Sequence, residues 1–276
     1  KYQGIVDVDF NTANIWVVGI GGIGSVVGYR LVSSGIRPLL IDGWPENVTA
    51  MNDVGLELSG QHAPPISVRS VLFDQVEKDE PKPDIVCLCV KSFQTESALS
   101  AISAHLKDDS IVISLQNGIN EETIIERIER EFVIGCVVVM DGRLIAPGVG
   151  YQENPNERIF VVGNLEGKFD KRVHVAAALL NIIGEVSVTD NIWGELWSKL
   201  VHNCLINGVC ALTLFDGATA LRDNMIWPFA YGLACEAVEV ASANGIKLES
   251  SGLFGCDPTD FLEGNEKRIQ EAIYTA

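Results

Sequence analysis

The sequence predicts an α/β protein in which a doubly wound, largely parallel sheet is followed by a smaller all-helical domain. Between residues 15 and 140, apolar runs rich in β-branched residues alternate with helix-like stretches, which is typical of strand–helix–strand units. A triplet of glycines follows the first apolar run, at the point where a strand would turn into a helix. Beyond residue 190 only helical periodicity remains. We therefore expect two domains, at residues 1–187 and 188–276.

The first domain is expected to begin with parallel strands joined by helices. The run at 84–90 is almost entirely apolar, as in a central strand that is covered on both faces. The expected strands are 15–18, 39–42, 66–72, 84–90, 110–115 and 132–140, and the expected helices are 25–33, 48–53, 95–106 and 121–130.

The character of the sequence changes after residue 142. Short alternating runs at 148–153 and 158–162, separated by proline and glycine, predict an antiparallel extension of the same sheet. The remaining expected elements are a helix at 169–183, a strand at 185–189, and helices at 193–208, 225–244 and 266–274.

The glycine triplet has the G-x-G-x-x-G spacing of a dinucleotide-binding turn, which makes the predicted sheet Rossmann-type. Gly19 would allow the tight turn, Gly21 would let a diphosphate approach the backbone, and Gly24 would let the helix pack closely on the strand. The N-terminus of that helix would offer N–H groups to the phosphates. A glycine-rich turn without a ligand is the alternative. The predicted cofactor-binding residues of this loop are Gly19, Ile20, Gly21, Gly22, Ile23 and Gly24.

An acidic residue ends the second predicted strand. Asp42 stands 18 residues after Gly24, where a dinucleotide fold places a carboxylate that accepts hydrogen bonds from the adenosine ribose. A 2′-phosphate would meet this carboxylate as a like charge, and neither Gly43 nor Trp44 supplies a cation. The residues therefore predict NAD(H) in preference to NADP(H).

Composition limits the function classes. With 276 residues, 47% of them apolar and 21% charged, the chain is long enough for a substantial core. Its formal charge of −17 argues against a nucleic-acid partner, because phosphates would be repelled. No apolar run approaches the roughly 20 residues of a membrane helix. The N-terminal residues lack a signal-peptide pattern, and we expect a cytoplasmic protein.

The cysteines and histidines do not predict a metal site. Seven cysteines lack C-x-x-C spacing, and four histidines are scattered along the chain. We expect reduced thiols, with Cys87 and Cys89 packing as small apolar side chains.

Two polar segments follow predicted strands at the edge where open α/β sheets bind ligands. Lys91 comes after the strand at 84–90, and Asn117 comes after the strand at 110–115. A surface cation and a plain Asn-Gly turn are the alternative interpretations.

The helix predicted at 193–208 carries an unusual polar row. Lys199, Asn203 and Asn207 stand at i, i+4 and i+8 and share one helical face among apolar neighbours. Buried amides and ammonium groups need partners, and a substrate is one candidate. A solvated stripe on an amphipathic helix is the alternative. His202 lies off this face, where we expect a structural role.

Together these segments resemble the ketopantoate reductases (2-dehydropantoate reductases) over residues 15–247. The resemblance rests on four motifs in order: the glycine triplet, Val90-Lys91-Ser92-Phe93-Gln94-Thr95, Leu115-Gln116-Asn117-Gly118, and Trp197-x-Lys199-Leu200-x-x-Asn203 followed by Asn207 and Ala211-Leu212-Thr213.

The resemblance implies a role for each polar residue. Lys91 and Gln94 would contact the cofactor, and Asn117 would lie near the nicotinamide ribose and the substrate. Lys199 would be the catalytic lysine, and Asn203 and Asn207 would bind the keto acid. An ammonium group suits this chemistry, because it can stabilise and protonate the oxygen that gains charge when hydride reaches a ketone carbon.

The chain departs from the family at two places. Gly43 occupies the position where the family commonly has a cation for the 2′-phosphate, so the family's preference for NADPH transfers poorly to this chain. NADP(H) is the family-based alternative to NAD(H). The family's Ser-rich piece and Thr-Glu pair are not found in residues 250–276, and neither Glu263 nor Glu266 has the surrounding pattern. We expect this chain to be a trimmed version of a longer protein.

The leading functional prediction is NAD(P)H-dependent reduction of a branched, anionic 2-keto acid, with 2-dehydropantoate as substrate and pantoate as product, in pantothenate biosynthesis. A reductase of a different 2-keto acid, a non-catalytic nucleotide-binding sensor of the same fold, and an opine-type dehydrogenase are the alternatives. A homodimer formed through the helical domain is a further expectation.

Overall fold

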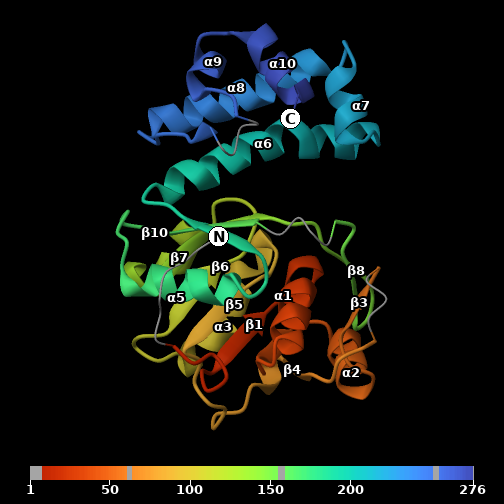
Figure 1. Cartoon of the computed structure of the whole chain (residues 1–276), viewed down its shortest axis with the longest axis vertical. Helices are drawn as coiled ribbons and strands as arrows, with labels where there is room; N and C mark the ends of the chain where they lie inside the picture. Colours follow the sequence, from red (N-terminus) through yellow and green to blue (C-terminus); the bar gives the residue numbers. More distant parts are fainter. Residues whose placement is uncertain (1–7, 61–63, 155–158, 251–254, 276) are drawn as a thin grey trace. The chain divides into compact units, whose positions relative to one another are not determined.

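The computed structural model describes residues 8–60, 64–154, 159–250 and 255–275 and divides into two compact units, Lys1–Asp190 and Asn191–Ala276 (Figure 1). The expected strand at 158–162 begins with Arg158, which lies outside the described residues, as do residues 1–7 of the N-terminal segment. The last strand of the first unit, β11 (Glu185–Val188), extends one residue beyond the predicted domain boundary.

The first unit is built on an eight-stranded sheet with the order β11-β10-β7-β6-β5-β1-β2-β4. Every neighbouring pair is parallel except β10 and β7, which are antiparallel. This arrangement confirms the doubly wound α/β sheet. The strands before β11 are β1 (Ile15–Val18), β2 (Leu39–Asp42), β4 (Arg69–Leu72), β5 (Ile85–Leu88), β6 (Ile111–Ser114), β7 (Val133–Val139) and β10 (Ile159–Asn164).

The central strands are buried on both faces, which explains their apolar sequences. All four residues of β1, of β5 and of β6 are buried. One face packs against α1 (Gly22–Ser33) and α5 (Lys171–Leu180) in a single apolar core (Figure 1). The other helices of this unit are α2 (Pro45–Asp53), α3 (Thr95–Ile102) and α4 (Glu121–Ile125), with 3₁₀ turns at Phe73–Gln75, Ser92–Gln94, Ser103–His105 and Arg130–Phe132.

A separate three-stranded sheet replaces part of the predicted extension. The expected strand at 148–153 does not join the main sheet: β9 (Val149–Tyr151) pairs with β3 (Glu57–Ser59) and β8 (Arg143–Ala146), so this prediction was wrong. Close packing on α1 explains the difference. A Cβ at Gly150 would lie 2.5 Å from Ser25 Oγ, and one at Gly142 would lie 2.6 Å from the Gly22 carbonyl oxygen.

The second unit is entirely helical in its described residues. Its core forms where α6 and α8 present apolar side chains at four-residue spacing, and alanines on α8 allow close packing. No described helix has the length and hydropathy to cross a membrane. The helices are α6 (Ile192–Thr213), α7 (Gly217–Arg222), α8 (Trp227–Ala243), α9 (Pro258–Leu262) and α10 (Glu266–Thr275).

The end of α6 contains a strained residue. Among the residues that the structure describes, Leu214 is the one non-glycine residue with a positive φ, which is 60°. Its side chain is 90% exposed. Because a side chain disfavours this conformation and glycine does not, Leu214→Gly should raise the free energy of unfolding by about 1 kcal/mol.

Urea denaturation of this variant beside Leu212→Gly checks the prediction. Leu212 is 79% exposed but lies within the helix, so its replacement should cost about 1 kcal/mol. Equal destabilisation of both variants would contradict the explanation by backbone strain.

Candidate functional site

The glycine triplet forms the turn from β1 into α1. Gly19 has φ +91°, and a Cβ there would lie 2.7 Å from the backbone nitrogen of Val90, at the end of β5. A Cβ at Gly24 would lie 1.9 Å from the Gly19 carbonyl oxygen. Both positions therefore need glycine for the local fold, with or without a ligand.

Gly21 differs from the other two glycines, because no atom lies within 4 Å of the position where its Cβ would be. Helix α1 begins directly after it, with no side-chain cap and no acidic residue in its first turn. Its first N–H groups are thus left without a side-chain acceptor. This combination of open space and N–H groups suits the diphosphate of a dinucleotide.

Gly22, a predicted cofactor-binding residue, also packs closely on the Gly142 loop. A Cβ at Gly22 would lie 2.1 Å from the Gly142 carbonyl oxygen, so the absence of a side chain permits the contact with the loop after β7. Ile20, also in the predicted set, is fully buried, and its backbone N–H donates to Asp42 Oδ2 at 3.2 Å. Ile23 is half-buried and packs against the core of the first unit.

Asp42 ends β2 beside the glycine-rich turn. Its carboxylate accepts hydrogen bonds from the backbone N–H groups of Gly43 at 2.6 Å and Trp44 at 3.3 Å. The carboxylate is half-buried and Trp44 is exposed, so a ligand can reach this strand end.

The polar segments after β5 and β6 are joined to each other. Ser92 Oγ donates to the Asn117 carbonyl oxygen at 2.9 Å. The buried Gln116 amide donates to the Val90 carbonyl oxygen at 2.9 Å and to Thr95 Oγ1 at 2.8 Å. These bonds set the two loops side by side, because β5 and β6 are neighbours in the sheet.

Lys91, Gln94 and Asn117 are exposed at these loops. The Lys91 backbone N–H donates to Gln94 Oε1 at 3.3 Å, which closes the turn of the 3₁₀ segment. The first unit therefore brings its predicted site residues to the carboxyl ends of four neighbouring strands, β6, β5, β1 and β2.

In the second unit, Lys199, Asn203 and Asn207 all lie on α6, which begins at the side-chain cap Asn191. Lys199 and Asn203 are half-buried and Asn207 is exposed, so the row becomes more accessible toward the C-terminal end of the helix. The adjacent Ser198 is buried and accepts a hydrogen bond from the Glu249 N–H at 2.8 Å.

The titration properties of this helix follow from burial. Burial lowers the pKa of the Lys199 ammonium group. Burial, and secondly the charge of Lys199, lower the pKa of His202 to about 4. His202 is thus neutral at pH 7. The ammonium group of Lys199 releases its proton more readily than that of an exposed lysine.

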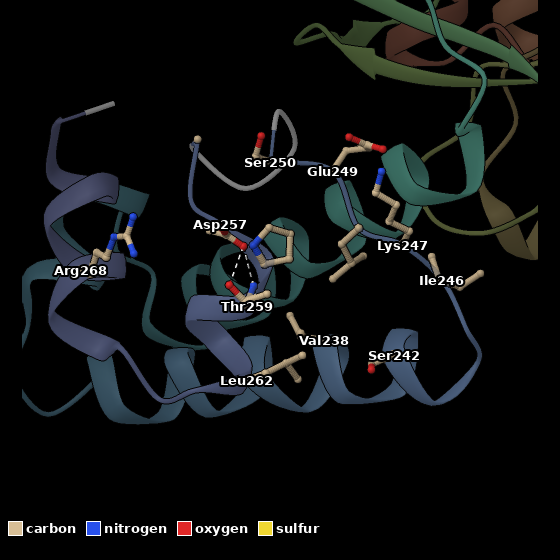
Figure 2. A pocket seen from close by; sticks show the side chains of 13 residues that line it. Val238, Ser242, Ile246, Lys247, Glu249, Ser250, Asp257, Thr259, Leu262 and Arg268 are labelled. Carbon is tan, nitrogen blue, oxygen red and sulfur yellow. Dashed lines mark hydrogen bonds between the residues drawn. The ribbon is translucent and has the colours of Figure 1, made fainter.

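A hollow of about 640 Å³ in the second unit contains none of the predicted site residues (Figure 2). Two of its charged side chains have partners within the unit: Asp257 Oδ1 accepts from the Thr259 N–H at 2.9 Å (Figure 2), and Arg268 pairs with Asp260 at 3.0 Å. This hollow is therefore not the candidate site.

The described residues contain no group of three or more side chains suited to a metal ion. All seven cysteines are free thiols. Burial raises the pKa of Cys87 to about 12, which makes this thiol inert.

The sequence interpretation missed two buried amides that build the site, Asn47 and Gln116. Asn47 precedes the helix expected at 48–53, whereas α2 begins at Pro45 and includes it. The sequence signal that could have identified Asn47 is a polar residue directly before an apolar helical pattern. Gln116 belongs to the Leu115-Gln116-Asn117-Gly118 motif, but its burial between the two loops is visible only in the structure.

Two family models match the chain. The model described as "Ketopantoate reductase PanE/ApbA" matches residues 15–167, and "Ketopantoate reductase PanE/ApbA C terminal" matches residues 191–272. The 2-dehydropantoate 2-reductase of Pyrococcus horikoshii is 31% identical over 239 residues, which cover 86% of this chain and 76% of the relative.

Two solved structures are similar over most of the chain. A D-mandelate dehydrogenase with NADH and anilino(oxo)acetate is 26% identical with a TM-score of 0.77, covering 93% of this chain and 80% of that chain. A PanE/ApbA family ketopantoate reductase from Ralstonia eutropha is 25% identical with a TM-score of 0.72, and the match covers 94% of this chain and 92% of that chain.

These matches extend across both compact units and include the glycine-rich turn, the loops after β5 and β6, and helix α6. The chain therefore belongs to the ketopantoate reductase family of NAD(P)-dependent oxidoreductases.

Proposed function

We propose that this protein reduces 2-dehydropantoate to pantoate with NADH. The observation that carries the proposal is the open, uncapped glycine-rich turn at Gly21, with Asp42, Lys91 and Asn117 at neighbouring strand ends. The names of the curated relatives support the substrate. NADH is favoured because Asp42 would repel a 2′-phosphate, and the mandelate dehydrogenase was solved with NADH.

The bound nicotinamide would supply a hydride to the keto carbon. In our proposal, Lys199 Nζ donates a proton to the keto oxygen as that hydride arrives, which yields the hydroxyl group and leaves a neutral amine that solvent reprotonates. Burial around Lys199 favours this role, because it weakens the hold of the ammonium group on its proton.

Asn203 and Asn207 would bind the substrate on the same helical face. Their amides can hold the hydroxyl and carboxylate groups of the keto acid without adding charge. Lys91 and Gln94 would contact the cofactor, and Asn117 would bind both the nicotinamide ribose and the substrate.

A second substrate, an aromatic 2-keto acid, is favoured by one observation. The D-mandelate dehydrogenase that resembles this chain at 26% identity acts on a 2-hydroxy acid with an aryl group. The chemistry at the carbonyl is the same in both cases, so the residues around the substrate side chain would decide between them.

The open turn predicts the effect of Gly21→Ala. The new methyl group meets no protein atom, so the melting temperature should stay within about 2 °C, but the methyl group would occupy the space proposed for the diphosphate. NADH affinity should fall at least about tenfold, which corresponds to roughly 1.4 kcal/mol.

Fluorescence titration with NADH measures this affinity, and Gly232→Ala is the matched control. Gly232 on α8 also has nothing within 4 Å of its Cβ position, so its replacement should leave affinity unchanged. Unchanged affinity of the Gly21 variant would contradict a diphosphate at this turn.

The proton donor is tested by Lys199→Ala in assays of NADH oxidation with 2-dehydropantoate, benzoylformate and pyruvate. The turnover number should fall by about 10²- to 10⁴-fold, while NADH affinity remains unchanged. Lys247→Ala, at an exposed lysine of the same unit, should retain full activity.

The pH profile gives a second readout for the same residue. The reduction needs the protonated amine, so kcat/KM should fall as the pH rises through the pKa of Lys199. Because burial lowers this pKa, the fall should occur at a lower pH than for an ordinary lysine. Equal rates in the wild type and Lys199→Ala would contradict the mechanism. A protein that binds NADH but reduces none of the three keto acids would favour the alternative function, a non-catalytic nucleotide-binding sensor.

We also propose that the protein is a homodimer whose helical units meet. The chain from the end of α6 to the start of α8 carries large exposed apolar side chains: Leu212 is 79%, Met225 91% and Phe229 57% exposed. Sedimentation equilibrium should give twice the 29.9 kDa chain mass, and Phe229→Glu should shift it toward the monomer. A monomeric wild-type protein would contradict this proposal.

A further inference from the structure

Asn47 on α2 is fully buried, and both N–H donors and the oxygen of its side-chain amide are hydrogen-bonded. Its Nδ2 donates to Asp42 Oδ2 at 2.6 Å and to the Ile20 carbonyl oxygen at 3.1 Å. Its Oδ1 accepts from the Gly148 N–H at 2.8 Å. One amide thereby connects the end of β2, the glycine-rich turn and the loop between β8 and β9.

The Asp42 carboxylate is held from two sides. Oδ2 accepts from Asn47 Nδ2 at 2.6 Å and from the Ile20 N–H at 3.2 Å, while Oδ1 accepts from the Gly43 N–H at 2.6 Å and the Trp44 N–H at 3.3 Å. Each oxygen thus has one short and one long bond. The short bonds orient the group, and the two long bonds are weaker interactions.

Of the two groups that make the short bonds, only Asn47 can be changed by substitution, because the Gly43 donor is a backbone N–H. The same Asn47 amide nitrogen also binds the Ile20 carbonyl oxygen, so it couples the direction of the carboxylate to the position of the glycine-rich turn. One buried side chain thus contacts both the carboxylate at the end of β2 and the glycine-rich turn.

We propose that Asn47 is a positioning residue for cofactor selection. Its amide holds the Asp42 carboxylate toward the adenosine ribose, so that the site accepts the 2′-hydroxyl of NADH and rejects the 2′-phosphate of NADPH. The proposal rests on the dinucleotide site proposed above. Without Asn47, the carboxylate can rotate away, which weakens NADH binding and relieves the repulsion of NADPH.

The same helix offers a matched control. Asn52 also anchors α2, through bonds from its Nδ2 to the Ser70 carbonyl oxygen at 2.9 Å and from the Ser70 N–H to its Oδ1 at 3.0 Å. It makes no bond to Asp42 or to the glycine-rich turn. Loss of either asparagine weakens the attachment of α2, but only Asn47 contacts the carboxylate.

The test is the ratio of the dissociation constants of NADPH and NADH, measured for the wild type, Asn47→Ala and Asn52→Ala. In Asn47→Ala, NADH should bind about tenfold more weakly while NADPH binding changes little, so the ratio falls about tenfold. In Asn52→Ala the ratio should equal that of the wild type. A general loss of structure would weaken both cofactors together and leave the ratio unchanged.

A double-mutant cycle with Asp42→Ala identifies the group through which Asn47 acts. If Asn47 acts through the carboxylate, Asn47→Ala should leave the ratio unchanged in the Asp42→Ala protein. If Asn47→Ala does not fold, Asn47→Leu, which keeps the volume of the side chain and removes both donors, replaces it in the same cycle. An unchanged ratio in a folded Asn47 variant, or additive effects in the cycle, would overturn the proposal.

The outcome is separable from that of the cofactor proposal. A wild-type protein that binds neither dinucleotide would refute the dinucleotide site itself. A wild-type protein that binds NADH, with a ratio insensitive to Asn47, would refute only the role assigned to this residue.

Discussion

The left-handed backbone at Gly19 is the constraint on which the first unit depends. The turn lets β1 pass into α1 while the Gly19 N–H donates to the Ile41 carbonyl oxygen at 2.7 Å. The missing side chain admits Val90 on one side, and Gly24 admits the Gly19 carbonyl on the other. Three strand ends thereby meet within contact distance, and the polar groups that follow them can act on one ligand.

Buried amides hold these strand ends in register. Asn47 and Gln116 are buried, and each bridges segments that are distant in sequence. An unpaired amide in such a position would cost about 1–3 kcal/mol, so these networks favour one loop arrangement over its alternatives. The exposed residues of the site, Lys91 and Asn117, therefore extend from loops whose backbones are already ordered.

Helix α6 combines structural and chemical roles on different faces. Val201, Leu205 and Val209 form the core of the helical unit, while Lys199 and Asn203 belong to the polar row. The partial burial of Lys199 lowers the pKa of its ammonium group, which suits a proton donor more than a solvated surface lysine. The electrostatics of the helix thus support the proposal that Lys199 is the proton donor.

The sequence by itself determined the alternating strands and helices, the glycine turn and the polar row on α6, because each is a local pattern of spacing. The tertiary structure alone decided which residues meet. Strand β9 belongs to a second sheet, since Gly150 permits contact with α1. Gly22 packs on the loop that contains Gly142. The tertiary structure also paired Asn47 with Gly148, 101 residues away. Such contacts depend on packing between distant segments, which no local pattern encodes.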